Sequence, residues 1–156
     1  MRAKPALLSP LSSDKSCFTN RPYGRITIIA RGMTGLKPLR WIASSKDDLS
    51  AMPREVRRDV GYALYVAQQG DKDADAKVLT GFGGAGVIEV IARHDGDTFR
   101  AVYTVRFAGV VYVLHAFQKK AKRGIATPKK EMDLIRKRLK LAERDYKQLT
   151  TTGEAP

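Results

Sequence analysis

Three apolar runs separated by two short turns constrain the fold of this chain more than any other feature. The runs span residues 87 to 93, 98 to 107 and 110 to 118. The Asp95-Gly96 pair between the first two runs is typical of a tight hairpin turn. Ala108-Gly109, between the second and third runs, is also a short turn. Because short turns join antiparallel neighbours, the stretch predicts a three-strand meander.

Helical spacing of apolar residues appears on both sides of this stretch. Residues 56 to 67 place apolar side chains on one face, and Pro53 either begins this helix or kinks an earlier one. Residues 132 to 149 carry apolar side chains at intervals of 3, 4, 3, 4 and 3, which predicts one stripe on a helix of about five turns. We expect Thr127 to cap that helix, with Pro128 at its first position. The two patterns consist of Val56, Val60, Ala63, Leu64, Ala67, Met132, Ile135, Leu139, Ala142, Tyr146 and Leu149.

These elements predict an α+β fold. A short strand at residues 39 to 43 precedes the first helices, and the meander follows them. We expect a small antiparallel sheet, formed by the N-terminal strand and the three-strand meander, to pack on the N-terminal helices, with a long C-terminal helix. Residues 71 to 86 are polar and glycine-rich. This composition predicts a loop. Within it residues 81 to 86 lack the following Lys-Ser/Thr pair of a phosphate-binding loop, so we interpret them as a flexible loop.

Residues 1 to 32 differ from the rest of the chain. They hold six basic residues and one acid without a sustained period. Three interpretations are open: a disordered basic tail, a targeting peptide, and an extension upstream of the native domain, with Met33 as the true start. The third is favoured because a compact pattern begins just after Met33. It divides the chain into an extension at 1–32 and a folded domain at 33–156.

Charge and cysteine content restrict the partners and the compartment. Lys and Arg outnumber Asp and Glu by 29 to 16, a net charge of +13, which favours anionic partners such as nucleic acid or an acidic protein. The single cysteine, Cys17, excludes an intrachain disulfide and a cysteine metal site, and it suits a reducing cytoplasm. No apolar run approaches the ~20 residues that span a bilayer, so we expect no membrane partner.

The alternation of side chains along a strand divides the predicted sheet into two faces. In the middle strand the arginines share one face, and the apolar side chains, Tyr103 among them, fall on the other. In the last strand His115 is expected to lie opposite Tyr112 and Leu114. A consistent register, which the sequence leaves open, brings six polar residues to one partly open face. These are Glu89, Arg93, Arg100, Arg106, His115 and Lys119.

The last strand leaves this face as Leu-His-Ala-Phe-Gln-Lys-Lys, a histidine followed by a cluster of cations. Cleavage of RNA by its own 2′-hydroxyl needs a base, an acid and cations that stabilise the charge on the phosphorane. An arginine can clamp the phosphate, lysines can supply the field without a metal ion, and a histidine can move protons near neutrality. We therefore predict Arg100, His115, Lys119 and Lys120 as catalytic residues, and Arg93, Arg106 and Lys122 as substrate-binding residues.

Each of these residues also has a purely structural interpretation. A lone histidine on a strand is more often packed with a satisfied hydrogen bond than catalytic. Arg100 and Glu89 could form a cross-strand ion pair, and lysines at a strand end are usually only solvated. His94 lies in the hairpin turn, and we expect no function for it.

Three stretches of the sequence resemble a known family. They read LSAMPREVRRDVGYALYVAQQG, GAGVIEVIARHDGDTFRAVYTVRFAGVVYVLHAFQKK and IATPKKEMDLIRKRL. From about residue 39 to 146 the chain resembles the HigB-like, phage-derived-protein-like branch of the RelE/ParE toxin superfamily. The resemblance implies a cytoplasmic toxin of a type II toxin–antitoxin pair, which cuts messenger RNA on the ribosome without a cofactor. It also implies a helix-turn-helix antitoxin as partner, and it points to the same four catalytic positions.

Two functions from different classes follow from this resemblance. The leading hypothesis is a ribosome-dependent, metal-independent mRNA endonuclease. The alternative is a non-enzymatic toxin that inhibits DNA gyrase or another protein, since some members of the superfamily poison gyrase. A plain nucleic-acid-binding module is disfavoured by the shortage of aromatic residues for base stacking.

Overall fold

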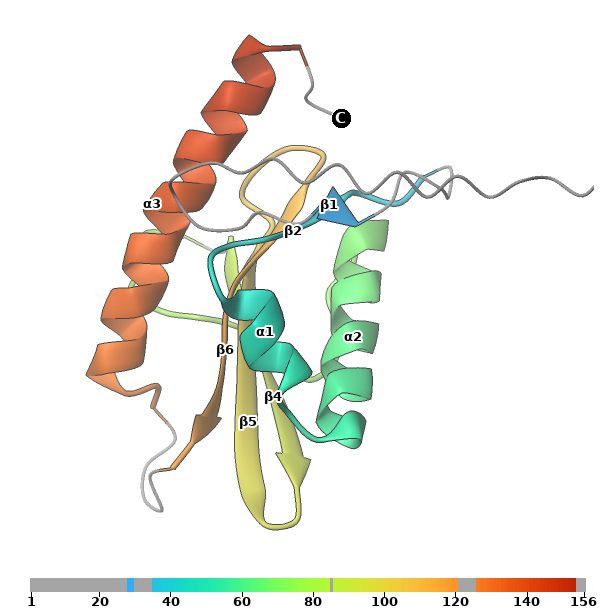
Figure 1. Ribbon diagram of the computed structural model, residues 1–156, viewed down its shortest axis with the longest axis vertical. Helices are drawn as coiled ribbons and strands as arrows, with labels where there is room; N and C mark the ends of the chain where they lie inside the picture. The colour runs from blue at the N-terminus through green and yellow to red at the C-terminus, as the bar shows by residue number, and fades with distance from the viewer. Residues whose placement is uncertain (1–27, 30–34, 85, 121–125, 154–156) are drawn as a thin grey trace, which may run out of the picture.

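The computed structural model describes residues 28–29, 35–84, 86–120 and 126–153. In this part of the chain, α1 and α2 lie on one face of a central sheet and α3 lies on the other (Figure 1). The helices are α1 (Ser45–Ser50), α2 (Arg54–Gln69) and α3 (Lys129–Thr151). The strands are β1 (Ile28–Ile29), β2 (Leu39–Trp41), β3 (Ala76–Val78), β4 (Val87–His94), β5 (Asp97–Thr104) and β6 (Val111–Lys119).

The strand order within the described residues is β1-β2-β6-β5-β4-β3. The predicted meander is confirmed, because β4, β5 and β6 are successive antiparallel neighbours. The α+β class and the long C-terminal helix are confirmed as well. However, β2 runs parallel to β6, so the sheet is mixed and not wholly antiparallel. A parallel neighbour requires a long crossover, and here both N-terminal helices and most of the meander separate the two strands.

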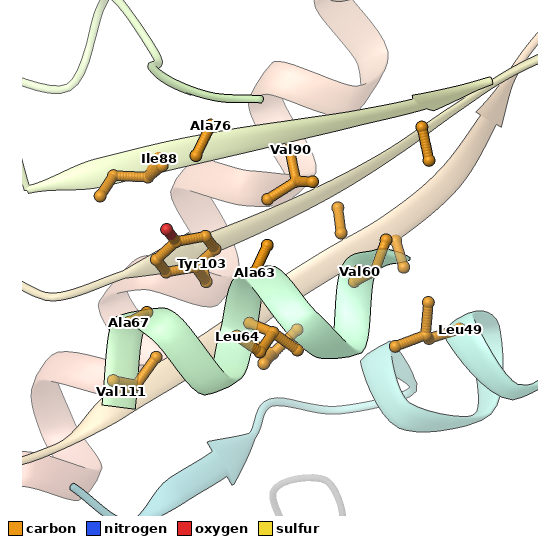
Figure 2. Packing of buried hydrophobic residues seen from close by; sticks show 14 of the residues in the cluster. Leu49, Val60, Ala63, Leu64, Ala67, Ala76, Ile88, Val90, Tyr103 and Val111 are labelled. Atoms are coloured by element: carbon orange, nitrogen blue, oxygen red, sulfur yellow. The ribbon is translucent and has the colours of Figure 1, made fainter. Parts of the chain in front are cut away.

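Helix α2 forms the core on the first face of the sheet. It begins directly after Pro53, so this proline starts a second helix instead of kinking α1. It ends at Gly70, whose φ of 97° is a left-handed conformation that glycine adopts without strain. The predicted apolar face of α2 is buried against the sheet together with Leu49 of α1 (Figure 2). Tyr103 has no exposed surface in this core, as its parity predicted.

Helix α3 forms the core on the second face. Four residues of its predicted apolar stripe are buried and the other two are partly buried, so the stripe is confirmed. The expectation that Thr127 caps the helix is wrong. Pro128 occupies the cap position, and the Thr127 hydroxyl bonds residues of the sheet instead.

The glycine-rich segment before β4 is anchored to α3. Phe82 is only 8% exposed and packs in the α3 core, with the Arg136 guanidinium 5.5 Å from its ring centroid. The Arg106 Nη2 donates to the carbonyl oxygens of Phe82 and Gly83 at 3.0 and 3.2 Å. The interpretation of residues 81 to 86 as a flexible loop did not include this anchor, and the loop predicted for residues 71 to 86 did not include β3.

Of the predicted extension at residues 1–32, the structure describes only residues 28–29. Ile28 and Ile29 form β1 and pair with Arg40 and Leu39 of β2. The three interpretations of residues 1–32 otherwise concern positions outside the described ranges. No helix in the described part of the chain is long and apolar enough to cross a membrane.

Candidate functional site

A β-bulge in β6 decides which side chains face α3. Val102 on β5 pairs with His115, and its successor on β5 pairs with Val113, so Leu114 is an extra residue in β6. Leu114 consequently packs in the α3 core, and His115 bonds side chains of α3. The prediction that His115 lies opposite Tyr112 and Leu114 is therefore wrong, because strict alternation fails at the bulge.

Beyond the bulge, β4, β5 and β6 place nine side chains in three rows on the α3 side of the sheet. Each row consists of one β5 residue and its partners on the two neighbouring strands. The first row is Glu89, Val102 and His115, the second is Ile91, Arg100 and Phe117, and the third is Arg93, Thr98 and Lys119. The segment that begins α3 contacts the first two rows, whereas the β4–β5 hairpin continues past the start of α3 (Figure 1).

Arg100 and Glu89 form a buried ion pair across the first two rows. The Arg100 Nη1 donates to both Glu89 oxygens at 2.7 and 2.8 Å, and the two residues are 3% and 6% exposed. The Thr127 hydroxyl donates to Glu89 Oε1 at 2.6 Å and accepts from Arg100 Nη1 at 2.9 Å. The expectation of a partly open face with Arg100 free to clamp a phosphate is wrong, because Thr127 and the start of α3 close over this pair.

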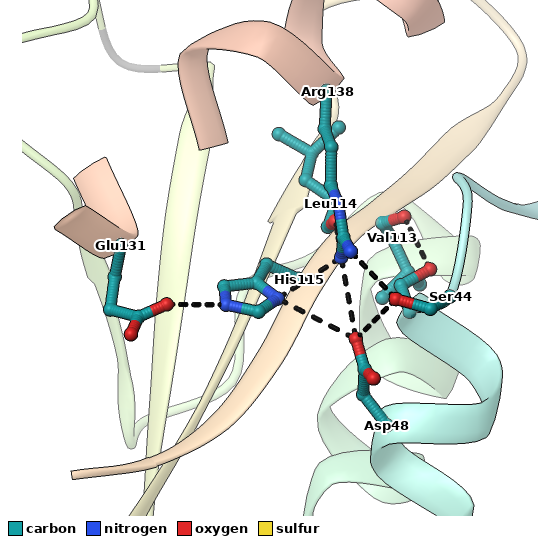
Figure 3. Close-up of polar contacts among 8 residues, drawn as sticks. Ser44, Asp48, Val113, Leu114, His115, Glu131 and Arg138 are labelled. Carbon is teal, nitrogen blue, oxygen red and sulfur yellow. Dashed lines mark hydrogen bonds and ion pairs between the residues drawn. The ribbon is translucent and has the colours of Figure 1, made fainter. Parts of the chain in front are cut away.

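His115 lies between side chains of α1 and α3 (Figure 3). Its Nε2 is 2.7 Å from Glu131 Oε2, and its Nδ1 is 3.0 Å from Arg138 Nη1. Because a guanidinium only donates, we assign Nδ1 as the acceptor and Nε2–H as the donor to Glu131. The Asp48 carboxylate lies 3.7 Å from Nδ1, and the ring stacks on Phe117 with centroids 5.0 Å apart. His115 is 6% exposed, so the partly open face predicted for it is wrong too.

Arg138 ties together α1, β6 and α3. Its Nη1 donates to the Leu114 carbonyl oxygen at 2.9 Å and lies 3.4 Å from Asp48 Oδ2, and its Nη2 donates to Ser44 Oγ at 2.7 Å. The pairing of β2 with β6 ends at Trp41. Arg138 therefore supplies a donor to β6 where the neighbouring strand has stopped.

The surroundings of His115 favour its neutral form. Burial lowers the pKa of His115 below its ordinary value of 6.5, and the Arg138 guanidinium lowers it further. The hydrogen bond to Glu131 and the charges of Glu131 and Asp48 act in the opposite direction but are outweighed. His115 is therefore a neutral, packed histidine with satisfied hydrogen bonds, which agrees with the structural interpretation given for it from the sequence.

We expect the stability of the protein to depend on His115 in mild acid. In the unfolded chain this histidine binds a proton near pH 6.5, whereas its lowered pKa keeps it neutral in the folded state. The contribution of His115 is thus complete above about pH 6.5 and is lost progressively as the pH falls below that value. Urea titrations at pH 7.5 and 5.5 should show a smaller loss of unfolding free energy on acidification in His115→Gln than in the natural protein. A His94→Gln variant serves as the control, and an unchanged loss in His115→Gln would refute the assignment.

The third row is the exposed part of the predicted site. Arg93 is exposed and Lys119 is half-buried, on either side of Thr98, and the exposed Lys120 follows directly. Neighbouring strands lie ~4.8 Å apart, so the backbones at Arg93 and Lys119 are about 10 Å apart. The structure therefore brings together three of the predicted cations, and Lys122 lies outside the described residues.

Arg106 does not belong to this group. It follows Thr104 at the far end of β5, whereas Arg93 pairs with Thr98 near the start of that strand. The rise along a strand separates the two arginines by about 25 Å. Arg106 binds the glycine-rich segment and lies 3.8 Å from Glu143 of α3. Its predicted place in one site with Arg93 is wrong, because shared parity does not imply a shared end of the sheet.

Sequence reasoning missed the residues that hold His115 and Arg100. Glu131 and Arg138 are seven residues apart in α3, which places them on one helix face with the buried Ile135. The sequence did contain a signal for these two residues, because both charges fall in line with the apolar stripe of α3. The contacts of Asp48 and Thr127 join distant segments, and no local pattern indicates them.

A separate cleft of about 680 Å³ lies between α2 and the β3–β4 edge. Its lining includes Arg58 and Tyr62 of α2, Lys77 of β3 and Arg93 of β4, together with Asp73 and Asp75. Because acids alternate with these cations, the cleft has no uniform charge. Within the described ranges no group of three or more His, Cys, Asp or Glu residues is arranged to hold a metal ion.

Comparison with known proteins identifies the family. Residues 47–140 match the family described as Phage derived protein Gp49-like (DUF891), from α1 to the middle of α3. The match covers more than half of the chain and includes the ion pair and all three rows. Neither a curated protein nor a solved structure matches the chain. The chain therefore belongs to the Gp49-like family of phage-derived proteins, within the clan of RelE/HigB-type toxins.

Proposed function

We propose that this protein is the toxin of a type II toxin–antitoxin pair and that it cuts messenger RNA on the ribosome without a metal ion. Membership in a clan of RelE/HigB-type toxins supports the toxin role. The observation that carries the nuclease proposal is the third row, where Arg93 and Lys119 flank Thr98 beside the exposed Lys120. Cations held at a strand end are suited to a phosphodiester.

In the proposed reaction the 2′-hydroxyl of the RNA attacks the adjacent phosphorus. The bond from phosphorus to the 5′-oxygen breaks, water accepts the 2′-hydroxyl proton and donates one to the departing 5′-oxygen, and the products are a 2′,3′-cyclic phosphate and a 5′-hydroxyl. Negative charge accumulates on the phosphorane oxygens, and Lys119, Lys120 and Arg93 stabilise it. Electrostatic stabilisation of this kind is usually the largest single contribution to an enzymatic rate.

Arg100 and His115 take a different role in this proposal. Both are buried and bonded behind the third row, so we assign them as positioning residues. Arg100 fixes β5 to β4 and to the start of α3 through Glu89 and Thr127. His115 fixes β6 to α3 through Glu131. A rigid sheet beneath the cations keeps their geometry constant.

The burial of the only histidine predicted to be catalytic also favours a second candidate. A toxin that inhibits DNA gyrase or another protein without chemistry needs no proton-transfer group. The exposed cations would then meet an acidic protein surface. In either case we propose a helix-turn-helix antitoxin as the neutralising partner, in keeping with the toxin clan.

Inducible expression in a bacterial host tests the proposal. We expect the natural protein to arrest growth and to produce new 5′ ends within messages that are being translated. Arg93→Ala combined with Lys119→Ala should lower cleavage by about 10²-fold or more, the effect of removing one or two stabilising groups from a transition state. Mapping of transcript ends by sequencing gives the measurement.

The matched control removes two exposed cations from α2, Arg54→Ala with Arg57→Ala. It changes the net charge equally and should leave cleavage intact. Growth arrest with intact transcripts and altered DNA supercoiling would replace the nuclease proposal with the gyrase alternative. Equal loss of cleavage in both double variants would show that only total charge matters, and it would remove the third row from the proposal.

A further inference from the structure

The outer face of α3 is strongly basic, and neither the core nor the third row accounts for it. Seven exposed cations lie along the helix, whereas the exposed Asp133 pairs with Arg136 at 2.9 Å and the partly exposed Glu143 lies 3.8 Å from Arg106. With 100° per residue these positions fall within an arc of about 120°, opposite the buried stripe. They extend over about 27 Å of helix. The exposed cations are Lys129, Lys130, Arg136, Lys137, Lys140, Arg144 and Lys147.

Most of these cations have no partner within the described part of the protein. Lys137, Lys140, Arg144 and Lys147 make no ion pair with any described residue. We call these four residues the α3 basic arc. Like charges three and four residues apart on a helix are mildly destabilising, so the arc costs stability in the isolated protein.

The outer face of α2 differs in its charge pattern. It mixes both signs, with Arg54, Arg57 and Arg58 beside Glu55 and Asp59. A mixture of this kind is typical of solvated surfaces. The α3 basic arc departs from it and forms a single-sign field on a straight, rigid element.

We propose that the α3 basic arc binds the phosphate backbone of double-stranded RNA. Consecutive cations of the arc rise by about 4.5 to 6 Å along the helix, a spacing that keeps them in continuous contact with a line of phosphates. No exposed aromatic residue lies on this face of α3 among the described residues, which excludes base stacking as the mode of contact. Recognition through phosphates alone suits a duplex, whose bases are enclosed.

This inference rests on the proposed function, since a toxin that acts on the ribosome works among RNA duplexes. The α3 basic arc would hold the toxin on structured RNA, and the third row would meet the single-stranded message. Lys129 and Lys130 connect the two surfaces, because they follow Thr127, which contacts Arg100 directly behind the third row.

Fluorescence anisotropy with a labelled 16-base-pair RNA duplex tests the inference. With four phosphate contacts, the logarithm of the association constant should fall with the logarithm of salt concentration at a slope of about −3.6. Lys140→Glu combined with Arg144→Glu should reduce the slope to about −1.8 and weaken binding at 100 mM KCl by about tenfold or more. The control reversal, Arg54→Glu with Arg57→Glu on α2, should leave the affinity within about twofold of the natural protein.

Several outcomes would overturn the proposal. Equal weakening by the α2 and α3 reversals would mean that only net charge matters. Tighter binding to a DNA duplex of the same sequence, or to vesicles that contain phosphatidylserine, would assign the arc to another polyanion. The binding assay involves no cleavage and is repeated with Arg93→Ala/Lys119→Ala. Normal duplex binding by that variant, even if the natural protein cuts no RNA, would separate failure of the nuclease proposal from failure of this one.

Discussion

Replacement of Arg100 by alanine should lower the free energy of unfolding by about 3–5 kcal/mol, the cost of breaking a buried ion pair from one side. Glu89 would keep its charge at 6% exposure, with only the Thr127 hydroxyl as a donor among the contacts described above. An uncompensated buried carboxylate is expensive, because it is neither solvated nor paired. Chemical denaturation followed by circular dichroism measures the loss.

Two further variants make the Arg100 result decisive. Arg93→Ala, in the exposed third row, should change stability by no more than about 0.5 kcal/mol. Arg100→Met combined with Glu89→Leu should recover most of the lost stability, because an apolar pair of similar volume often replaces a buried ion pair at little cost. If Arg100→Ala were as stable as the natural protein but had lost its toxicity, Arg100 would act on the substrate directly, and its assignment as a positioning residue would be wrong.

Replacement of Arg138 by alanine should lower the free energy of unfolding by about 3 kcal/mol. The change leaves the Leu114 carbonyl and the His115 Nδ1 buried without their donor, and each orphaned group costs about 1–3 kcal/mol. It also removes the bond from α3 to Ser44, the residue directly before α1. The adjacent Lys137→Ala alters an exposed side chain on the same helix and should be nearly neutral.

The Arg138 variant has a second readout that a general loss of packing would not produce. Burial and, after it, the Arg138 guanidinium lower the pKa of His115, so removal of the guanidinium should raise that pKa, because Glu131 remains hydrogen-bonded to the ring. Histidine resonances followed by NMR across pH 4.5 to 8 report the change. A pKa of His115 that stays unchanged or falls would contradict the assigned tautomer and the direction of the Arg138 hydrogen bond.

The apolar patterns of the sequence were sufficient for most of the fold. The period of α3 placed its stripe in the core, and the two short turns specified the meander of β4, β5 and β6. Both predictions depend on neighbours within a few residues, where the chain geometry alone sets which side chains share a face. The parallel pairing of β2 with β6 was not accessible in this way, because it joins segments about 70 residues apart.

The candidate site shows more clearly what strand alternation can and cannot predict. Strand parity correctly grouped Arg93 with Lys119, and the cross-strand pair of Arg100 with Glu89 was among the structural alternatives. Parity also placed His115 on the face of Arg100 and Lys119, but it failed for Tyr112 and Leu114, which share that face because a single extra residue in β6 interrupts the alternation. It also grouped Arg106 with a site about 25 Å away, since alternation carries no information about position along the sheet.

The sequence by itself determined the strands of the meander and their order, the apolar faces of α2 and α3, and the excess of positive charge. Only the tertiary structure decided which of the charged residues meet solvent. Burial depends on where α3 and Thr127 dock against the sheet, and that docking is a sum of contacts between distant segments. Arg100 and His115 are therefore buried residues that hold the sheet together, whereas Arg93 and Lys120 are exposed and Lys119 is half-buried.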